Sequence, residues 1–316
     1  MWKLYKAIWR HTAKRQLVLI VLSVAVAGLA AVPLDYQKDI INGLTRGLGY
    51  SEILRLGAEM IAVILLSLAL KWVLNFQASL AGEWAIKRLR TRVCEEAGSR
   101  GNDGERELEE GTLANMVSSE SETVGKFVGD AVAEPVLQIG TLISVVGYIA
   151  FTQPRLGLLL LFVVTPQIVI LALTQSRINT LVAERVLVLR RSINQVTKHD
   201  IAKVKQSILE DFDRIYGTRR KIFVWKLSTK FVLSVINGFG LVAVLTIGGW
   251  LVIEGKSDVG TVVAATIGLG RIEQPWRLLA AFYRNLNAIR VQYDLMQEMF
   301  AELNAEDETQ LAGQRT

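Results

Sequence analysis

Few residues in this sequence have the types and spacing that catalyse reactions. Asp35 and Asp39 stand four positions apart, so they share one helix face and could act as paired carboxylates. Lys38 lies between them, which favours an ion pair near a membrane surface over proton transfer. Two histidines and a single cysteine, Cys94, exclude an internal disulfide and leave almost nothing to bind a metal. We therefore predict no catalytic and no metal site.

A second set of polar residues interrupts segments that are otherwise apolar. Arg271 lies 12 residues into such a segment, and Glu273 and Arg277 have the spacing of an ion pair on one helix face. Pro275 removes a backbone hydrogen bond and predicts a kink. Because ionisable groups inside a membrane usually mark a transport pathway, we predict one here. The predicted pathway residues are Lys71, Gln138, Asn237, Arg271, Glu273, Gln274 and Arg277.

Structural explanations for these residues stay open. Lys71 could extend to the inner headgroups, and Arg271 could be buried against a neighbouring helix beside a carboxylate. Amides and hydroxyls at ordinary helix contacts would show the same pattern. If the residues do line a pathway, their net positive charge favours an anionic or amphipathic substrate.

Membrane-spanning helices must hold these residues in place. Hydrophobic residues make up 51% of the 316 positions and charged residues only 21%. The apolar residues gather in uncharged runs of 18, 18, 20 and 23 residues, at Leu17–Leu34, Val136–Gln153, Leu156–Gln175 and Phe231–Ile253. About 20 helical residues cross a hydrocarbon core of ~30 Å. These runs exclude an ordinary soluble enzyme.

Two weaker apolar stretches raise the predicted number of spans to six. We predict an all-α polytopic membrane protein in which an interfacial elbow helix, residues 1–15, precedes a membrane domain over residues 16–300. An acidic, flexible tail is predicted at 301–316. The predicted spans are about 17–41, 53–76, 133–153, 155–175, 228–253 and 259–283.

The basic residues predict the orientation of these spans. Lysines and arginines concentrate before the first span and after the second and fourth, whereas the other connections carry only Arg46, Arg155 and Lys256. Because basic loops stay on the cytoplasmic side, both termini are predicted to be cytoplasmic, in the inner membrane. The net charge of +6 then reflects this bias, and we predict membrane lipid rather than nucleic acid as a partner.

The predicted connections differ greatly in length between the two sides. Those facing outward have about 15, 2 and 5 residues, and those facing inward have about 60 and 55. Both long connections show helical spacing, for example Ile178, Leu181, Val182 and Leu189 in the second. They predict two long helical hairpins that project into the cytoplasm, with tips available for docking.

Three segments resemble ATP-binding cassette (ABC) exporters. Glu110–Val124 is similar to the stretch that follows the second span of that family. Ile253–Ala264 is similar to the link between the fifth and sixth spans, and Gln274-Pro275-Trp276 to the middle of the sixth helix. With six spans, an elbow helix and two long hairpins, the resemblance covers residues 1–300.

The resemblance implies a type I exporter fold with an exchange of helices between two subunits. The fourth and fifth helices would reach across to a second ABC membrane domain, in a homodimer or a heterodimer. Coupling helices near 107–116 and 208–218 would dock on an ATPase, although the second segment could also be a solvated helix tip. The implied coupling residues are Glu109, Gly111, Leu113, Asn115, Leu209, Phe212, Arg214 and Tyr216.

The sequence contains no phosphate-binding loop and no ABC signature motif. The nearest match, Gly249–Ser257, has five residues between its glycines where the motif has four. We therefore expect no enzymatic activity in this chain, and ATP and Mg²⁺ on a partner ATPase chain. The predicted function is the permease subunit of an exporter that works by alternating access. The alternatives are a regulatory or structural membrane domain that pairs with a complete half-transporter, a truncated remnant, or an ATP-independent transporter.

Overall fold

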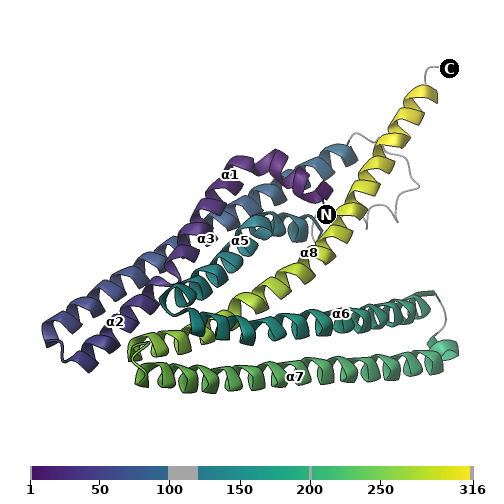
Figure 1. Ribbon diagram of the computed structural model, residues 1–316. Helices are drawn as coiled ribbons and strands as arrows, with labels where there is room; N and C mark the ends of the chain where they lie inside the picture. The colour runs from purple at the N-terminus through teal and green to yellow at the C-terminus, as the bar shows by residue number, and fades with distance from the viewer. Residues whose placement is uncertain (1, 99–119, 199–200, 314–316) are drawn as a thin grey trace. The chain divides into compact units, whose positions relative to one another are not determined.

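The computed structural model describes residues 2–98, 120–198 and 201–313, and all its regular elements in these ranges are helices (Figure 1). The prediction of a helical protein is therefore confirmed for the described residues. The helices are α1 (Trp2–Leu29), α2 (Val32–Arg46), α3 (Tyr50–Gly98), α5 (Ser121–Thr152), α6 (Pro154–Lys198), α7 (Ile201–Ile253) and α8 (Val259–Gly313). The chain divides into two compact units, Met1–Tyr148 with Glu273–Thr316, and Ile149–Ile272.

Within the described residues, five segments are long and apolar enough to cross a membrane. They are Thr12–Arg46, Tyr50–Glu95, Ser121–Thr152, Pro154–Leu189 and Lys205–Ile253. The predicted sixth span, 259–283, is helical throughout but is not among them. Its apolar run is interrupted by Arg271, Glu273 and Arg277, so its membrane crossing stays a prediction.

The helix boundaries differ from the predicted ones in three places. No break separates the elbow from the first span, since α1 runs from Trp2 to Leu29. The predicted span 17–41 is interrupted at 30–31. In a continuous helix the Pro33 ring would clash with the carbonyl four residues earlier, so α1 ends before it and Pro33 lies in the first turn of a new helix, α2. At the other end, the residues of the predicted tail continue α8 as a helix to Gly313.

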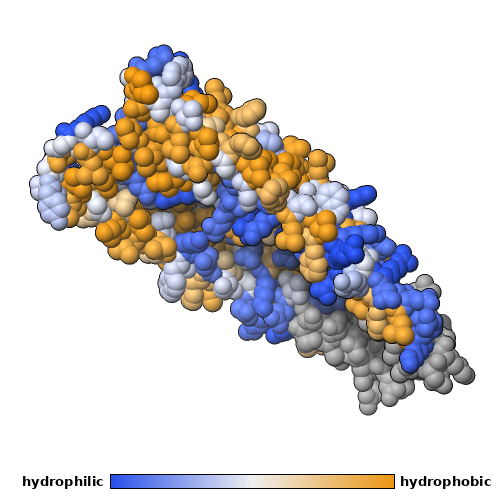
Figure 2. All heavy atoms as spheres, turned by 90° about the horizontal axis from the view of Figure 1, so that it is seen from below, coloured by the Kyte–Doolittle hydropathy of each residue, from blue (hydrophilic) through white to orange (hydrophobic). Residues whose placement is uncertain are grey.

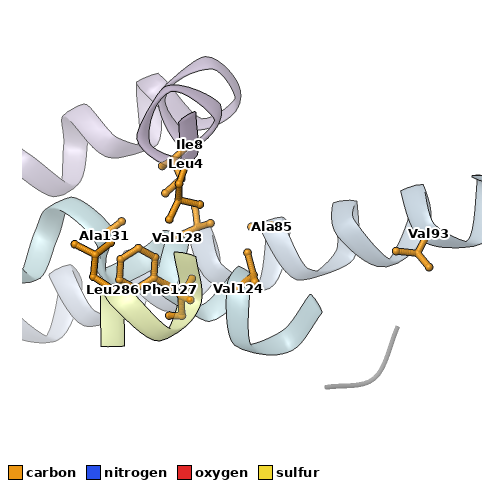
Figure 3. Packing of buried hydrophobic residues seen from close by; sticks show 10 residues of the cluster. Leu4, Ile8, Ala85, Val93, Val124, Phe127, Val128, Ala131 and Leu286 are labelled. Atoms are coloured by element: carbon orange, nitrogen blue, oxygen red, sulfur yellow. The ribbon is translucent and has the colours of Figure 1, made fainter. Parts of the chain in front are cut away.

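The first unit is built around two apolar clusters. One joins α1, α3 and α5, and the other joins these three helices to the second half of α8. In Figure 3, Leu4 and Ile8 of α1 point towards Val128, while Phe127 of α5 lies beside Leu286 of α8. The rings of Phe127 and Phe282 stack with centroids 5.6 Å apart. The amphipathic start of α1 therefore packs on the bundle through its apolar residues.

Helices α3 and α5 approach so closely that only glycine fits at two positions of α5. A Cβ atom on Gly129 would lie 2.2 Å from the carbonyl oxygen of Ala78, and one on Gly125 would lie 2.8 Å from the backbone nitrogen of Ile86. The two glycines are four residues apart, as in the small-residue contacts of membrane helices. Their small size allows the two backbones to touch.

The second unit consists mainly of an antiparallel pair of long helices, α6 and α7, which lie side by side in Figure 1, and it also contains the start of α8. Its contact positions alternate in steps of three and four, the spacing of a coiled coil. The sequence pattern placed Leu189 among the buried apolar residues of this helix. Leu189 is instead 42% exposed, because the row of buried residues on α6 runs through its neighbour Val188. The buried or half-buried seam is Ile178, Leu181, Arg185, Val188 and Ser192 on α6, and Ile208, Asp211, Ile215, Thr218 and Ile222 on α7.

A five-residue turn, 254–258, joins α7 to α8 within the segment predicted as a link between spans. Gly255 adopts a left-handed conformation with φ 70°, which glycine tolerates without strain. Asp258 caps α8 by accepting a hydrogen bond of 2.8 Å from the Thr261 backbone N–H. Gly249 lies inside α7, so the near-match to a phosphate-binding loop is a helix end.

Large apolar side chains are exposed on both units. Figure 2 shows them over broad areas of the surface in view. The most exposed include Phe151, Phe162, Phe239 and Ile253, which are 92%, 78%, 73% and 87% exposed. Apolar areas of this extent are typical of surfaces that face lipid or a partner protein.

Candidate functional site

The predicted pathway residues of the first unit make contacts within their own helices. Gln138 is buried in α5 and donates a hydrogen bond of 3.1 Å to Glu134. Arg277 pairs with Glu273 at 3.9 Å, which confirms the ion pair expected from their spacing. Lys71 and Gln274 are exposed.

The second unit holds the remaining two pathway residues, Asn237 and Arg271. Asn237 accepts a hydrogen bond of 2.9 Å from the amide of Gln167, which is only 7% exposed. Arg271 is half-buried, as the structural explanation for it requires. Sequence reasoning missed Gln167, although the preceding Pro166 marks a point where the helix loses a backbone hydrogen bond.

The carboxylates Asp35 and Asp39 form an ion-paired cluster. The Lys38 ammonium lies 2.6 Å from Asp35 and 3.6 Å from Asp39. The Tyr148 hydroxyl, on α5, donates to Asp35 at 2.8 Å. The predicted ion pair is therefore confirmed, and Tyr148 extends it by connecting α2 to α5.

Polar side chains of α1 compensate for a proline in α5. Pro135 has no N–H to donate to the carbonyl of Ala131, four residues earlier. The hydroxyl of Tyr5 donates to this carbonyl at 3.2 Å. Further along α1, Gln16 donates to the Val128 carbonyl at 2.9 Å and Ser23 to the Ala133 carbonyl at 3.2 Å. These bonds fix α1 against the part of α5 that the proline perturbs.

Replacing Tyr5 by phenylalanine should destabilise the protein by about 1 kcal/mol, since the Ala131 carbonyl loses its donor. Burial raises the pKa of the Tyr5 phenol above that of an exposed tyrosine, about 10. The unfolded chain therefore releases this proton at lower pH than the folded protein does. The contribution is complete below pH 10 and is lost as the pH rises through the folded pKa.

Thermal unfolding in detergent between pH 8 and 11 measures this effect. The melting temperatures of the wild type and Tyr5→Phe should differ below pH 10 and converge as the pH rises through the raised pKa of Tyr5 in the folded protein. A constant difference across the range would show that the phenolic proton has no part in the contact. Tyr283→Phe is a suitable control, because Tyr283 is 54% exposed.

The two predicted coupling segments differ in what the structure shows. The first, with Glu109, Gly111, Leu113 and Asn115, lies outside the described residues. The second lies within α7, which begins at Ile201, whereas α6 ends at Lys198. The segment 208–218 is therefore about two to five helical turns from the start of α7.

Within this second segment, the predicted coupling residues have two distinct environments. Leu209, Phe212 and Tyr216 are 46%, 51% and 71% exposed on α7. Arg214 forms an ion pair of 3.0 Å with Glu184 of α6, so it contributes to the hairpin itself. The exposed apolar and aromatic side chains are the ones available to another protein.

The five long apolar helices identify the chain as an integral membrane protein. The family described as ABC transporter transmembrane region matches residues 17–198, more than half of the sequence. The chain therefore belongs to the membrane-domain family of ABC transporters, as the sequence motifs predicted. A comparison with curated proteins gave no match.

Proposed function

We propose that this chain is the permease subunit of an ABC-type exporter in the cytoplasmic membrane. It contributes the membrane pathway, and ATPase domains on another chain bind ATP and Mg²⁺ and drive alternating access. The match to the membrane-domain family of ABC transporters supports this role, since that domain works together with an ATPase.

The main support for this proposal is the length of three helices of this chain. Helices α3, α6 and α7 contain 49, 45 and 53 residues, whereas about 20 cross the hydrocarbon core. Each helix therefore has about 25 residues or more for a rod outside the membrane. Such rods are the feature that the exporter resemblance implies and that an ATPase would use to move the spans.

The second unit supports pairing with another ABC membrane domain. The α6–α7 hairpin makes up most of the second unit and exposes Phe223, Phe231 and Phe239 along α7. These side chains are exposed within the chain, so they need lipid or a partner protein around them. We propose a helix-exchanged homodimer or heterodimer, with α8 as the sixth span and both termini in the cytoplasm.

Co-purification from the native host tests the proposed function. The chain is isolated in mild detergent, and its stoichiometric partners are identified by mass spectrometry. Recovery of an ATPase subunit without a membrane domain of its own would support the permease proposal. Vesicles that contain both subunits should then show ATP-dependent transport. Recovery without any ATPase would refute the proposed coupling.

Phe212→Ala and Tyr216→Ala should weaken the association with the ATPase, singly and more strongly together. Truncation of a buried aromatic anchor at an interface typically costs about 2 kcal/mol or more, which corresponds to about 30-fold in Kd. Both side chains are exposed, so the fold should be unchanged. Titration of the purified permease with the ATPase measures the effect.

The matched control is Trp250→Ala, an exposed aromatic residue at the other end of α7. Equal affinities for Phe212→Ala, Tyr216→Ala and the wild type would show that 208–218 is not a docking segment. The alternative function, a regulatory membrane domain, predicts a different result. In that case, the partner recovered from the host would be a complete half-transporter.

A further inference from the structure

A pocket of about 120 Å³ opens between four helices of the first unit. Its lining comes from the start of α1, the second half of α3, the start of α5 and the second half of α8. On α1 the lining residues precede Leu17, where the first uncharged run begins, and on α3 they follow Leu80, the last large apolar side chain that this helix exposes among its described residues. On α5 and α8 they lie outside the predicted spans 133–153 and 259–283. A ligand would therefore reach this pocket from water and not from the hydrocarbon core.

The floor of the pocket is apolar. Its aliphatic residues are buried or half-buried, and Figure 3 shows all of them except Leu89: Leu4, Ile8, Ala85, Leu89, Val124 and Val128. Trp84 adds an aromatic ring to the same lining. An apolar cavity of about 150 Å³ binds benzene. A pocket of about 120 Å³ that is open to water on one side can therefore hold an apolar group of about one ring.

The polar residues of the lining come as two pairs on facing helices. Arg88 and Arg92 lie one helical turn apart on α3, and Tyr293 and Gln297 lie one turn apart on α8. Burial raises the pKa of the Tyr293 phenol, and the nearby charge of Arg92 opposes this effect only in part. The phenol is therefore protonated at neutral pH and can donate a hydrogen bond, as the Gln297 amide can. All four side chains offer donors beside the apolar floor.

The charge of the lining is positive. Among the described residues that line the pocket, none is acidic. Asp294, next to Tyr293 in the sequence, lies 3.6 Å from Arg290, which offsets its charge. The guanidinium carbon of Arg88 lies 5.3 Å from the centre of the Trp84 ring. Arginine contacts an aromatic ring through the face of its guanidinium and a carboxylate through the edge, so this contact is compatible with a bound anion.

We propose that this pocket binds a small soluble carboxylate whose apolar body is about one ring in size. The carboxylate binds at Arg88 and Arg92, and the apolar body lies on the floor beside Ala85. Arginine suits this role because its planar fork donates two parallel hydrogen bonds to a carboxylate. A few convergent polar groups beside an apolar floor are also the usual composition of a small-molecule site.

Other small ligands would use only part of the site. Inorganic phosphate has no apolar body and would gain nothing from the floor, and an uncharged ring would not use the positive charge. A carboxylate with one ring uses both. It would contact four helices at once, so its binding should stabilise α1 and α8 against α3. The inference concerns a ligand outside the spans and does not depend on what the protein transports.

Ligand-observed NMR titration of the full chain in detergent tests the proposal, with phenylpropionate as the probe. A compound of about 11 non-hydrogen atoms with ordinary ligand efficiency should bind with a Kd on the order of 1 mM. Two matched compounds separate the parts of the site. Phenylpropanamide keeps the ring without the charge, and propionate keeps the carboxylate without the ring. Each should bind at least about tenfold more weakly than phenylpropionate.

Three variants locate the binding site. Arg88→Gln removes an exposed charge and should weaken phenylpropionate binding about tenfold, because a hydrogen bond to a charged group is lost. Ala85→Leu fills the floor and should abolish binding, since Ala85 lines the pocket and is only 7% exposed. Lys87→Gln is the matched control, because Lys87 is an exposed cation next to Arg88 that does not line the pocket. It should keep the wild-type affinity.

Four results would overturn the proposal. Equal binding of phenylpropanamide and phenylpropionate would exclude recognition of the carboxylate, and equal binding of propionate would exclude use of the floor. Undiminished binding to folded Ala85→Leu would place the probe in the micelle or elsewhere on the chain. Equal loss of affinity in Lys87→Gln and Arg88→Gln would indicate a diffuse charge effect. If Ala85→Leu does not fold, Arg88→Gln and the two matched compounds still decide the question. None of these results bears on the partner ATPase, so the proposed transport function is tested separately.

Discussion

Gly129→Val should lower the melting temperature of the protein by about 5–10 °C in detergent. The Cβ atom of any larger residue would lie 2.2 Å from the Ala78 carbonyl oxygen, a backbone atom that cannot move without displacing α3. Overpacking of a close contact typically costs about 1–3 kcal/mol, and each kcal/mol corresponds to about 2–4 °C for a protein of this size. Gly129→Ala should give a smaller change in the same direction.

Gly147→Val is the matched control, because Gly147 lies on the same helix and a Cβ atom there would have no neighbour within 4 Å. The control also replaces a helical glycine by a β-branched residue, so the intrinsic helix propensity changes equally. Similar melting temperatures for Gly129→Val and Gly147→Val would show that α3 and α5 do not touch as described.

Hydrophobic runs predicted the helical class correctly, and five of the six predicted spans lie on segments long and apolar enough to cross a membrane. The criterion succeeds because every backbone polar group must be satisfied within a helix that crosses lipid. It is weakest for α8, where charges within 259–283 interrupt the run. The break at 30–31 could have been predicted from Pro33. Proline is unfavourable inside a helix but common in its first turn, so Pro33 indicates that a new helix begins shortly before it.

Contacts between helices could not be predicted from the sequence to the same degree. The helix predicted for 176–198 from the spacing of apolar residues was correct. Several apolar stripes are compatible with that spacing, however, and only the position of α7 determines that the buried stripe runs through Val188 rather than Leu189. The bond between Gln167 and Asn237 joins positions 70 residues apart. The ion pair of Lys38 with Asp35 was predictable because both partners lie within one helical turn.

Ser192→Ala should destabilise the α6–α7 hairpin, and Asp211→Leu should not. The Ser192 hydroxyl is 2% exposed and donates a hydrogen bond of 3.0 Å to the carboxylate of Asp211, which is 8% exposed. Removal of the donor leaves a buried carboxylate without this partner and should cost about 1–3 kcal/mol. Removal of the carboxylate instead places an apolar residue in the seam, and the Ser192 hydroxyl can still donate to the Val188 carbonyl at 3.1 Å, so no buried polar group is left without a partner.

Hydrogen exchange of the backbone amides in 176–230 measures the stability of the hairpin directly. Protection should fall for Ser192→Ala and should be retained or increased for Asp211→Leu. Asp213→Leu is the control, because Asp213 is exposed two positions further along α7.

A polar pair within a coiled-coil seam also fixes the register of the two helices. Asp211→Leu should therefore keep the hairpin stable but allow an altered register, detectable as a changed distance between labels on α6 and α7. An unchanged register with a destabilised hairpin would show that the pair serves stability alone.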